Sequence, residues 1–185
     1  MNLLATNYNE MFLDVSRKWL NDPEIRHFMN TRYVSKPGQR IWFETISNKK
    51  DYNIWGITSE NIPIGVFGIK NIRGEEGEFW GYIGEKQYWG LGIGDWMVCA
   101  AENKANELGL TSIRLRVLRD NYKAVNLYFK HCFKIIGLQK GKYVMKKDLH
   151  VADGEVPKES SGSYRTKPGR RIRAKGLQQR SSAND

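Results

Sequence analysis

The segment from Gln87 to Gly94 constrains the fold more than any other stretch of this sequence. It places three glycines, Gly90, Gly92 and Gly94, at alternate positions between a strand-like run and a long amphipathic helical pattern. Glycine reaches backbone conformations that a Cβ forbids and lets a ligand approach the backbone amides. A helix that begins here offers unpaired N–H groups and the positive end of its dipole, a combination that binds phosphate. The segment therefore predicts a strand-to-helix turn that holds an anion.

Two common phosphate-binding motifs do not fit this segment. No Lys-Ser or Lys-Thr pair follows the last glycine, as a nucleotide-hydrolase P-loop requires. A dinucleotide fold would place the glycines in an N-terminal βαβ unit, with an acidic residue after a second parallel strand. Here the glycines lie mid-chain, after a predicted meander of strands, so the turn belongs to another architecture. A turn that only packs the helix on the strand is the alternative.

The spacing of apolar residues predicts a mixed α+β domain. The first 50 residues are expected to be helical with tight turns between the helices, and β-rich runs begin at residue 52. The predicted elements in chain order are helices at 11–20, 23–29 and 39–47, strands at 52–58, 62–72 and 78–84, a helix at 95–108, a strand at 111–118, a helix at 122–131, and strands at 133–138 and 142–147. This order favours one sheet with helices packed against it.

Composition separates a folded domain from a tail. Hydrophobic residues make up 40% of the whole chain, which is enough to form a core in residues 1–149. No apolar run approaches the roughly 18 residues that span a bilayer. Residues 150–185 lack the apolar pattern and are predicted to be a disordered basic tail. Two alternatives stay open: an arm that contacts nucleic acid or the ribosome, and a non-native extension. Eight of the 30 basic residues lie in this tail, so the net charge of +10 is weak evidence for a nucleic-acid-binding domain.

The cysteines and the N-terminus favour a cytoplasmic setting. Cys99 and Cys132 match neither a metal-binding spacing nor a disulfide framework. The N-terminal residues lack the basic and apolar regions of a signal peptide. We therefore expect a cytoplasmic protein with no metal and no membrane contact, as a monomer or a homodimer.

Two motifs, taken together, resemble the GCN5-related N-acetyltransferases (GNATs). The first, Gln87-x-x-Gly90-x-Gly92, matches the family's Gln/Arg-x-x-Gly-x-Gly/Ala loop. The second resembles the family's Asn-x-x-Ala-x-x-Leu-Tyr-x-x-x-Gly-Phe, with a cysteine in place of the glycine, and reads Asn121-x-x-Ala124-x-x-Leu127-Tyr128-x-x-x-Cys132-Phe133. A helix and a strand separate the two motifs, as in the family, and the resemblance covers roughly residues 3–148.

The resemblance implies a fold, an activity and a cofactor. The fold is the GNAT fold, a central, mostly antiparallel twisted sheet of about six to seven strands flanked by helices. The activity is that of an acetyl-CoA-dependent N-acetyltransferase, with acetyl-CoA in a cleft where the fourth and fifth strands splay apart and its pyrophosphate on the glycine loop. The expected cofactor-binding residues are Ile83, Gln87, Tyr88, Trp89, Gly90, Leu91, Gly92, Ile93, Gly94, Asn121 and Asn126.

The resemblance also implies that Tyr128 is the general acid that protonates the coenzyme A thiolate as it leaves. A phenol with an ordinary pKa of about 10 is a suitable donor; packing on the preceding helix is the alternative. The acceptor amine must lose a proton before it attacks, and Glu78 is our candidate base, directly or through water. A solvated carboxylate at the start of a strand is the alternative for Glu78. His27 is a second candidate base, and His131 is expected to be structural.

The identity of the acceptor substrate is predicted from residues in the N-terminal half of the chain. Strand alternation places Glu78, Trp80 and Tyr82 on one face, where they would line one wall of the site. The segment from Trp19 to Met29 resembles two GNAT branches, one that acetylates nucleotide-linked amino sugars and one that acetylates the α-amino group of ribosomal proteins.

We expect the first branch, with direct transfer in a ternary complex and with Arg26, Trp80 and Tyr82 as substrate-binding residues. Arg26 and Arg32 would meet the diphosphate of the sugar nucleotide, with bland helix-surface charges as the alternative. A protein N-terminus is the second interpretation of the acceptor. A non-catalytic module that binds acyl-CoA or a polyanion is the third.

Overall fold

The computed structural model describes residues 1–46 and 48–149, which form a seven-stranded sheet in the order β1-β2-β3-β4-β5-β7-β6. Neighbouring strands are antiparallel except β4 and β5, which are parallel. The elements are β1 (Leu3–Asn7), α1 (Glu10–Asn21), α2 (Pro23–Met29), α3 (Lys36–Ile46), β2 (Tyr52–Ser59), β3 (Ile62–Arg73), β4 (Glu76–Ile83), η1 (Lys86–Tyr88), α4 (Ile93–Glu107), β5 (Ser112–Leu118), α5 (Tyr122–Lys130), β6 (Lys134–Gln139) and β7 (Lys142–Asp148). The predicted α+β class is confirmed.

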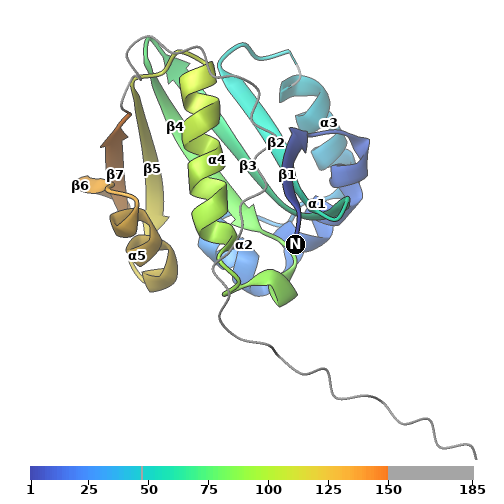
Figure 1. Cartoon of the computed structure of the whole chain (residues 1–185). Coiled ribbons are helices and arrows are strands. Elements are labelled where there is room, and N and C mark those ends of the chain that lie inside the picture. The colour runs from blue at the N-terminus through green and yellow to red at the C-terminus, as the bar shows by residue number, and fades with distance from the viewer. Residues whose placement is uncertain (47, 150–185) are drawn as a thin grey trace, which may run out of the picture. The chain divides into compact units, whose positions relative to one another are not determined.

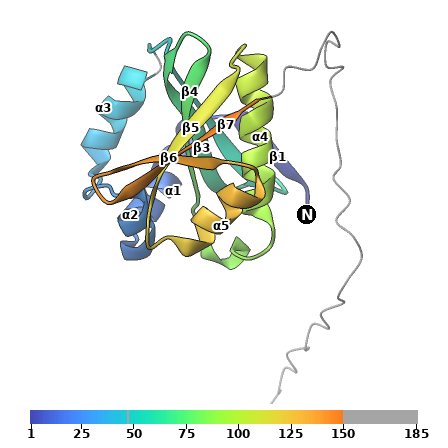
Figure 2. The same cartoon turned by 90° about the vertical axis from the view of Figure 1, so that its left-hand side faces the viewer.

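Helices cover the sheet on both faces (Figures 1 and 2). Helices α4 and α5 lie on one face, and α1, α2 and α3 lie on the other. Two apolar clusters correspond to these layers. The larger joins the sheet to α4 and α5 through residues such as Phe67, Val98 and Tyr128. The smaller joins α1 and α2 to the sheet through Phe12 and Tyr82.

Most predicted elements agree with the structure to within two residues at each end, and two predictions at the N-terminus are wrong. The expectation of helices throughout the first 50 residues missed β1, an edge strand of only five residues that pairs with β2. The helix predicted to begin at residue 39 begins at Lys36, so residues 36–38 form the first turn of α3. Proline is tolerated there because the first turn of a helix has no partner for its N–H groups.

The turn after α5 contains the cysteine that stands in the glycine position of the second motif. Cys132 has φ +64°, in the left-handed region that favours glycine. We expect Cys132→Gly to raise the free energy of unfolding by about 1 kcal/mol, because it removes the steric penalty of the Cβ. Chemical denaturation measures the change.

The matched control is Cys99→Gly, since Cys99 lies inside α4. Glycine within a helix costs about 1 kcal/mol, so the same substitution is expected to act in the opposite direction there. Equal effects at the two cysteines would contradict the explanation from backbone geometry.

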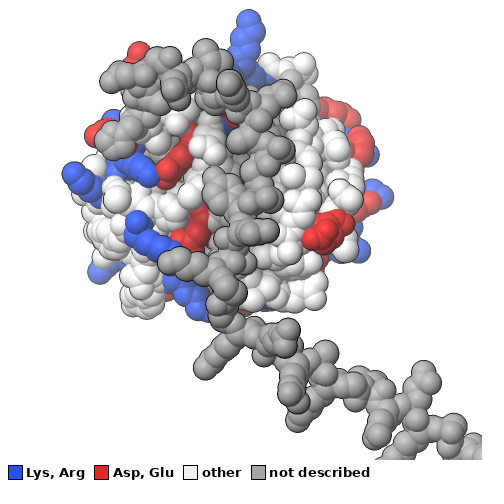
Figure 3. Space-filling view, viewed as in Figure 1, with Lys and Arg blue, Asp and Glu red and all other residues white. Residues whose placement is uncertain are grey.

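Charges of both signs lie on the face of the molecule that carries α4 and α5 (Figures 1 and 3). In Figure 3, Lys and Arg side chains lie beside Asp and Glu side chains, with uncharged residues between them. Two ion pairs cross between elements of this layer: Lys130 with Asp95, and Lys147 with Glu102, each with nitrogen and oxygen 2.6 Å apart. The visible described part of this face is therefore mixed in charge, unlike the continuous basic surface that is typical of a nucleic-acid-binding face.

The predicted tail, residues 150–185, lies outside the described residues. Among the helices that the structure describes, none combines the length and the apolar content needed to cross a membrane.

Candidate active site

The sheet opens between β4 and β5. The two parallel strands pair at only three positions, Glu76 with Ser112, Gly77 with Ile113 and Glu78 with Arg114, although both strands continue beyond these pairs. A cavity of about 1210 Å³, the main cavity, is lined by the separated parts of both strands and by residues of α1, α2, α3 and α5. The opening is where the resemblance implies the cofactor cleft.

The glycine loop leads from β4 into α4. Gly90 and Gly92 have φ of +76° and +81°, and a Cβ at either position would meet no atom within 4 Å. Gly92 is the N-cap of α4 and has no side chain to satisfy the first N–H groups of the helix. Free amides, a positive helix end and open space fit the pyrophosphate of a coenzyme A group.

Two tryptophans anchor the segment between β4 and the loop. The indole N–H of Trp89 donates to the carbonyl oxygen of Ile83 over 2.9 Å. The indole N–H of Trp19, on α1, donates to a carboxylate oxygen of Glu85 over 2.8 Å. The Trp19 ring also packs on Gly84, where a Cβ would lie only 2.0 Å from it. Helix α1 therefore fixes the start of the loop, a role that its apolar spacing alone did not reveal.

An ion-pair cluster joins the same loop to α2. The ammonium of Lys86 lies 2.8 Å from Asp22 and 3.0 Å from Glu24. Asp22 also caps α2 by accepting from the backbone N–H groups of Glu24 and Ile25. The hydrogen bond from Lys86 holds the pKa of Asp22 below its ordinary value. Sequence reasoning missed Lys86, because nothing local to residue 86 indicates its partners on α2.

The predicted cofactor residues fall into two groups. One group lines the main cavity, namely Ile83, Tyr88, Trp89, Gly90, Gly94 and Asn121. The other does not line it: Gln87, Leu91 and Gly92 are exposed on the loop, Ile93 is buried in the core, and Asn126 is exposed on α5. The oxygen of Asn121 caps α5 by accepting from the N–H of Ala124 over 3.2 Å.

Tyr128 lies on α5 with its side chain in the wall of the main cavity. Its ring packs edge-on against Phe79, 6.3 Å between centroids, and tilted against Phe133 at 5.7 Å. Burial raises the pKa of Tyr128 to about 12. Within the described residues its hydroxyl has no hydrogen-bond partner. The phenol therefore keeps its proton at neutral pH and has it free to donate.

Contacts between α4 and α5 hold Tyr128 in register with the glycine loop. Asp95, in the first turn of α4, accepts from Lys130 over 2.6 Å and lies 3.1 Å from His131. These hydrogen bonds, that from Lys130 first, hold the pKa of Asp95 below its ordinary value. His131 therefore helps to hold α5 on α4, which fits the structural role expected for it.

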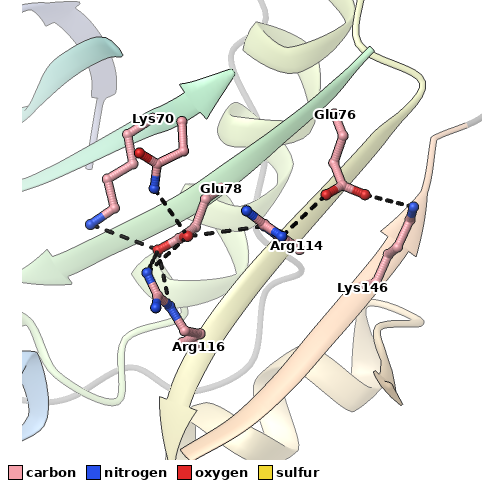
Figure 4. A network of polar contacts seen from close by, with 7 residues as sticks. Lys70, Glu76, Glu78, Arg114, Arg116 and Lys146 are labelled. Atoms are coloured by element: carbon pink, nitrogen blue, oxygen red, sulfur yellow. Dashed lines mark hydrogen bonds and ion pairs between the residues drawn. The ribbon is translucent and has the colours of Figure 1, made fainter. Parts of the chain in front are cut away.

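Glu78 is buried in the middle of a polar network on β4 (Figure 4). Both of its oxygens accept from one guanidinium nitrogen of Arg116, over 2.7 and 3.0 Å, and one also accepts from Asn71. Lys70 lies 3.7 Å away and Arg114 4.0 Å. Burial acts to raise the pKa of Glu78, but the Arg116 hydrogen bond and the charges of Lys70 and Arg116 outweigh it, so the pKa is lowered.

Aromatic side chains form the wall next to Glu78. Trp80 stacks on Tyr82 with centroids 6.4 Å apart, and Tyr52 meets Trp80 edge-on at 6.1 Å. All three line the main cavity. Burial raises the pKa of Tyr82 and of Tyr52, so both phenols are neutral. The predicted grouping of Glu78, Trp80 and Tyr82 on one face is present.

The N-terminal charges divide differently from the prediction. Arg32 lines the main cavity, whereas Arg26 is half-buried on α2 and does not. His27 lies 3.1 Å from Asp120 across the rim, with more than half of its side chain exposed. The structure therefore brings Arg32, and not Arg26, to the cavity.

Comparison with known proteins gives one consistent result. A family model described as an acetyltransferase (GNAT) domain matches residues 9–134. The chain is 26% identical over 141 residues to acetyltransferase PseH from Campylobacter jejuni, covering 75% of this chain and 87% of that protein.

Solved structures agree in fold. The chain resembles Vibrio cholerae spermidine N-acetyltransferase in complex with CoA and spermine, with TM-score 0.71 and 18% identity over 78% of this chain and 92% of that one. It also resembles Campylobacter jejuni N-acetyltransferase PseH in complex with acetyl coenzyme A, with TM-score 0.64 and 18% identity over 80% of this chain and all of that one.

Proposed function

The chain belongs to the GNAT acetyltransferase family and is an acetyl-CoA-dependent N-acetyltransferase, and from this premise we propose that its acceptor is the amine of a nucleotide-linked amino sugar. Acetyl-CoA supplies the acetyl group. The loop residues from Gly90 to Gly94 and the end of β4 would hold it. We also propose that residues 1–149 are the catalytic unit.

The observation that carries the acceptor proposal is the lining of the main cavity. Aromatic rings from the segment before α1 and from α3, β2 and β4 provide flat apolar surfaces, among them Tyr8, Trp42 and Trp80. Such rings stack on nucleobases. Five basic side chains and three carboxylates line the same cavity, namely Arg32, Lys70, Arg116, Lys123 and Lys142, and Glu24, Glu78 and Asp120. The positive excess favours an acceptor that carries phosphate and disfavours a polycationic amine.

The residues around the cavity support direct transfer in a ternary complex. Tyr128 would give its proton to the departing sulfur. Burial disfavours the charged form of both groups, so it opposes a free thiolate there as well as a phenolate. Cys99 and Cys132 are exposed and line no part of the main cavity, so neither is placed to carry an acyl group.

Glu78 has two candidate roles in this proposal. As a base it would take the proton of the acceptor amine, directly or through water. Its oxygens, however, are engaged by Arg116 and Asn71, and its pKa is lowered, which makes a carboxylate a weaker proton acceptor. These contacts favour a charge-balancing role, and the role of base stays a prediction.

The acceptor is tested by measuring thiol release from acetyl-CoA with a panel of amines. We expect the highest kcat/KM with nucleotide-linked amino sugars, at least about tenfold above the same sugars without the nucleotide, because stacking and phosphate contacts add binding energy. Peptides with free N-termini test the second interpretation, and spermidine tests the effect of positive charge. A higher kcat/KM with peptides would overturn the proposal. Removing residues 150–185 is expected to leave sugar acetylation intact.

A further inference from the structure

A second cavity lies beside the main one, and no step proposed above uses it. This arginine cavity has a volume of about 340 Å³ and is lined by Asn71, Arg73, Glu78, Arg114, Arg116, Gln139 and Val144. Glu78 and Arg116 line both cavities. The residues come from β3, β4, β5, β6 and β7, so the sheet itself builds the site.

The arginines in this cavity have unused hydrogen-bonding capacity. The side chain of Arg73 makes no hydrogen bond or ion pair within the described part of the chain. Arg114 lies 3.5 Å from Glu76 and 4.0 Å from Glu78, which is close enough for charge attraction and too far for a well-formed hydrogen bond. A guanidinium is a planar fork of N–H donors and has no acceptor, so these groups bind hydrogen-bond acceptors such as the oxygens of phosphate.

The charges in and around the arginine cavity do not balance. Three arginines and one carboxylate, Glu78, line it. Glu76, the other carboxylate that pairs with Arg114, is already held by Lys146, with nitrogen and oxygen 2.7 Å apart (Figure 4). That hydrogen bond keeps the pKa of Glu76 below its ordinary value. A surplus of guanidinium charge therefore faces this small polar hollow.

We propose that the arginine cavity binds a phosphate dianion, held by Arg73, Arg114 and the outer side of Arg116. Arginine pairs with phosphate through parallel N–H···O bonds, and the side-chain amides of Asn71 and Gln139, which also line the cavity, carry further N–H donors. The site is built on the sheet and contains no residue of the glycine loop, so it is separate from the pyrophosphate position. The phosphate has two possible sources: a free ion, or the phosphate of the acceptor, the second of which rests on the proposed function.

Calorimetric titration of the full chain with inorganic phosphate tests the site. The protein is first saturated with coenzyme A, so that the glycine loop is filled, and ionic strength is kept low to limit screening. We expect wild type to bind and Arg73→Gln to bind about tenfold or more weakly, the effect of losing one charge-assisted contact. The Arg73 side chain has no hydrogen bond or ion pair to lose within the described residues, so we expect this change to spare the fold.

The matched control is Arg40→Gln, because Arg40, on α3, pairs with Glu10 of α1 and lines neither cavity. It is expected to leave phosphate binding unchanged. No binding by the wild type, or equal binding by wild type and Arg73→Gln, would overturn the proposal. Because binding is measured without turnover, this failure is independent of the identity of the acceptor.

Kinetics then separate the two sources. If the acceptor supplies the phosphate, Arg73→Gln raises the acceptor KM by about the factor seen in the titration, and free phosphate competes with the acceptor. If the ligand is a free ion, phosphate and acceptor bind together and the acceptor KM is unchanged. Both results support the site.

Discussion

Tyr128→Phe is expected to lower kcat by about 100- to 10,000-fold, the usual contribution of a general acid, while acetyl-CoA binding is retained. The ring contacts with Phe79 and Phe133 survive the change, since phenylalanine keeps the ring. Within the described residues the hydroxyl has no hydrogen bond to lose, so the fold is expected to be as stable as wild type. Stopped assays of thiol release measure kcat, and the rise in Tm with added acetyl-CoA reports cofactor binding.

Tyr143→Phe is the control for this substitution. Tyr143 lies on β7, pairs with Val117 across the sheet and lines neither cavity. It is expected to retain wild-type turnover. If Tyr128→Phe turned over acceptor at the wild-type rate, another group would have to protonate the leaving sulfur, and Tyr128 would be a packing residue only.

Sequence alone could predict those parts of the fold in which the pattern is local. Helix α4 shows the 3.6-residue period over 15 residues, and its N-terminal glycines mark where it begins. Strand β1 has five residues and no such pattern, because what stabilises it is pairing with β2, more than 40 residues away. The sequence reports a hydrophobic period, and it does not report which strand lies next to which.

The same distinction between local and long-range patterns explains which residues of the active site could be predicted from the sequence. Glycines, the Asn121 cap and Tyr128 belong to short motifs, so their positions could be assigned from spacing. The partners of Glu78 come from β3 and β5, and finding them requires the register that places Glu78 beside Lys70 and Arg114. In the sequence, Arg114 and Arg116 alternate with Ile113, Leu115 and Val117, which indicates that the two arginines share one face of a strand. The alternation did not indicate that this face contains a buried carboxylate.

Among the substitutions proposed here, Glu78→Gln is expected to lower the free energy of unfolding the most, by about 1–3 kcal/mol. The change keeps the shape of the side chain and removes the negative charge that balances Arg116, Lys70 and Arg114. The expected loss is below that for a fully buried pair because the cations are partly exposed. The free energy of unfolding from urea denaturation at pH 7 measures it.

Glu76→Gln is the matched control, since Glu76 lies on the same strand, pairs with Arg114 and Lys146, and lines neither cavity. Its side chain is 33% exposed against 7% for Glu78. We expect it to cost no more than about 1 kcal/mol, as a surface pair does. Equal losses for the two substitutions would show that burial of the charge is not what matters.

The pH dependence of stability follows from the lowered pKa of Glu78. A carboxyl whose pKa is lower in the folded than in the unfolded state stabilises the fold above its ordinary pKa of about 4.3. That contribution is lost as pH falls through the folded-state pKa. The gap in unfolding free energy between wild type and Glu78→Gln is therefore expected to be constant near neutral pH and to shrink below about pH 4. A gap that stayed constant into strong acid would rule out the charge as its origin.

Turnover by the same variant separates the two roles of Glu78. A general base typically accelerates the chemical step by about 100-fold or more, and glutamine cannot accept the proton. A charge-balancing residue acts by keeping Arg116 and Lys70 in place, so its loss raises the acceptor KM and slows the maximal rate by less than about tenfold. Because Glu78 is already engaged by Arg116 and Asn71, we expect the second result. If a folded Glu78→Gln protein instead lost about 100-fold or more of its maximal rate at unchanged KM, Glu78 would be identified as the base.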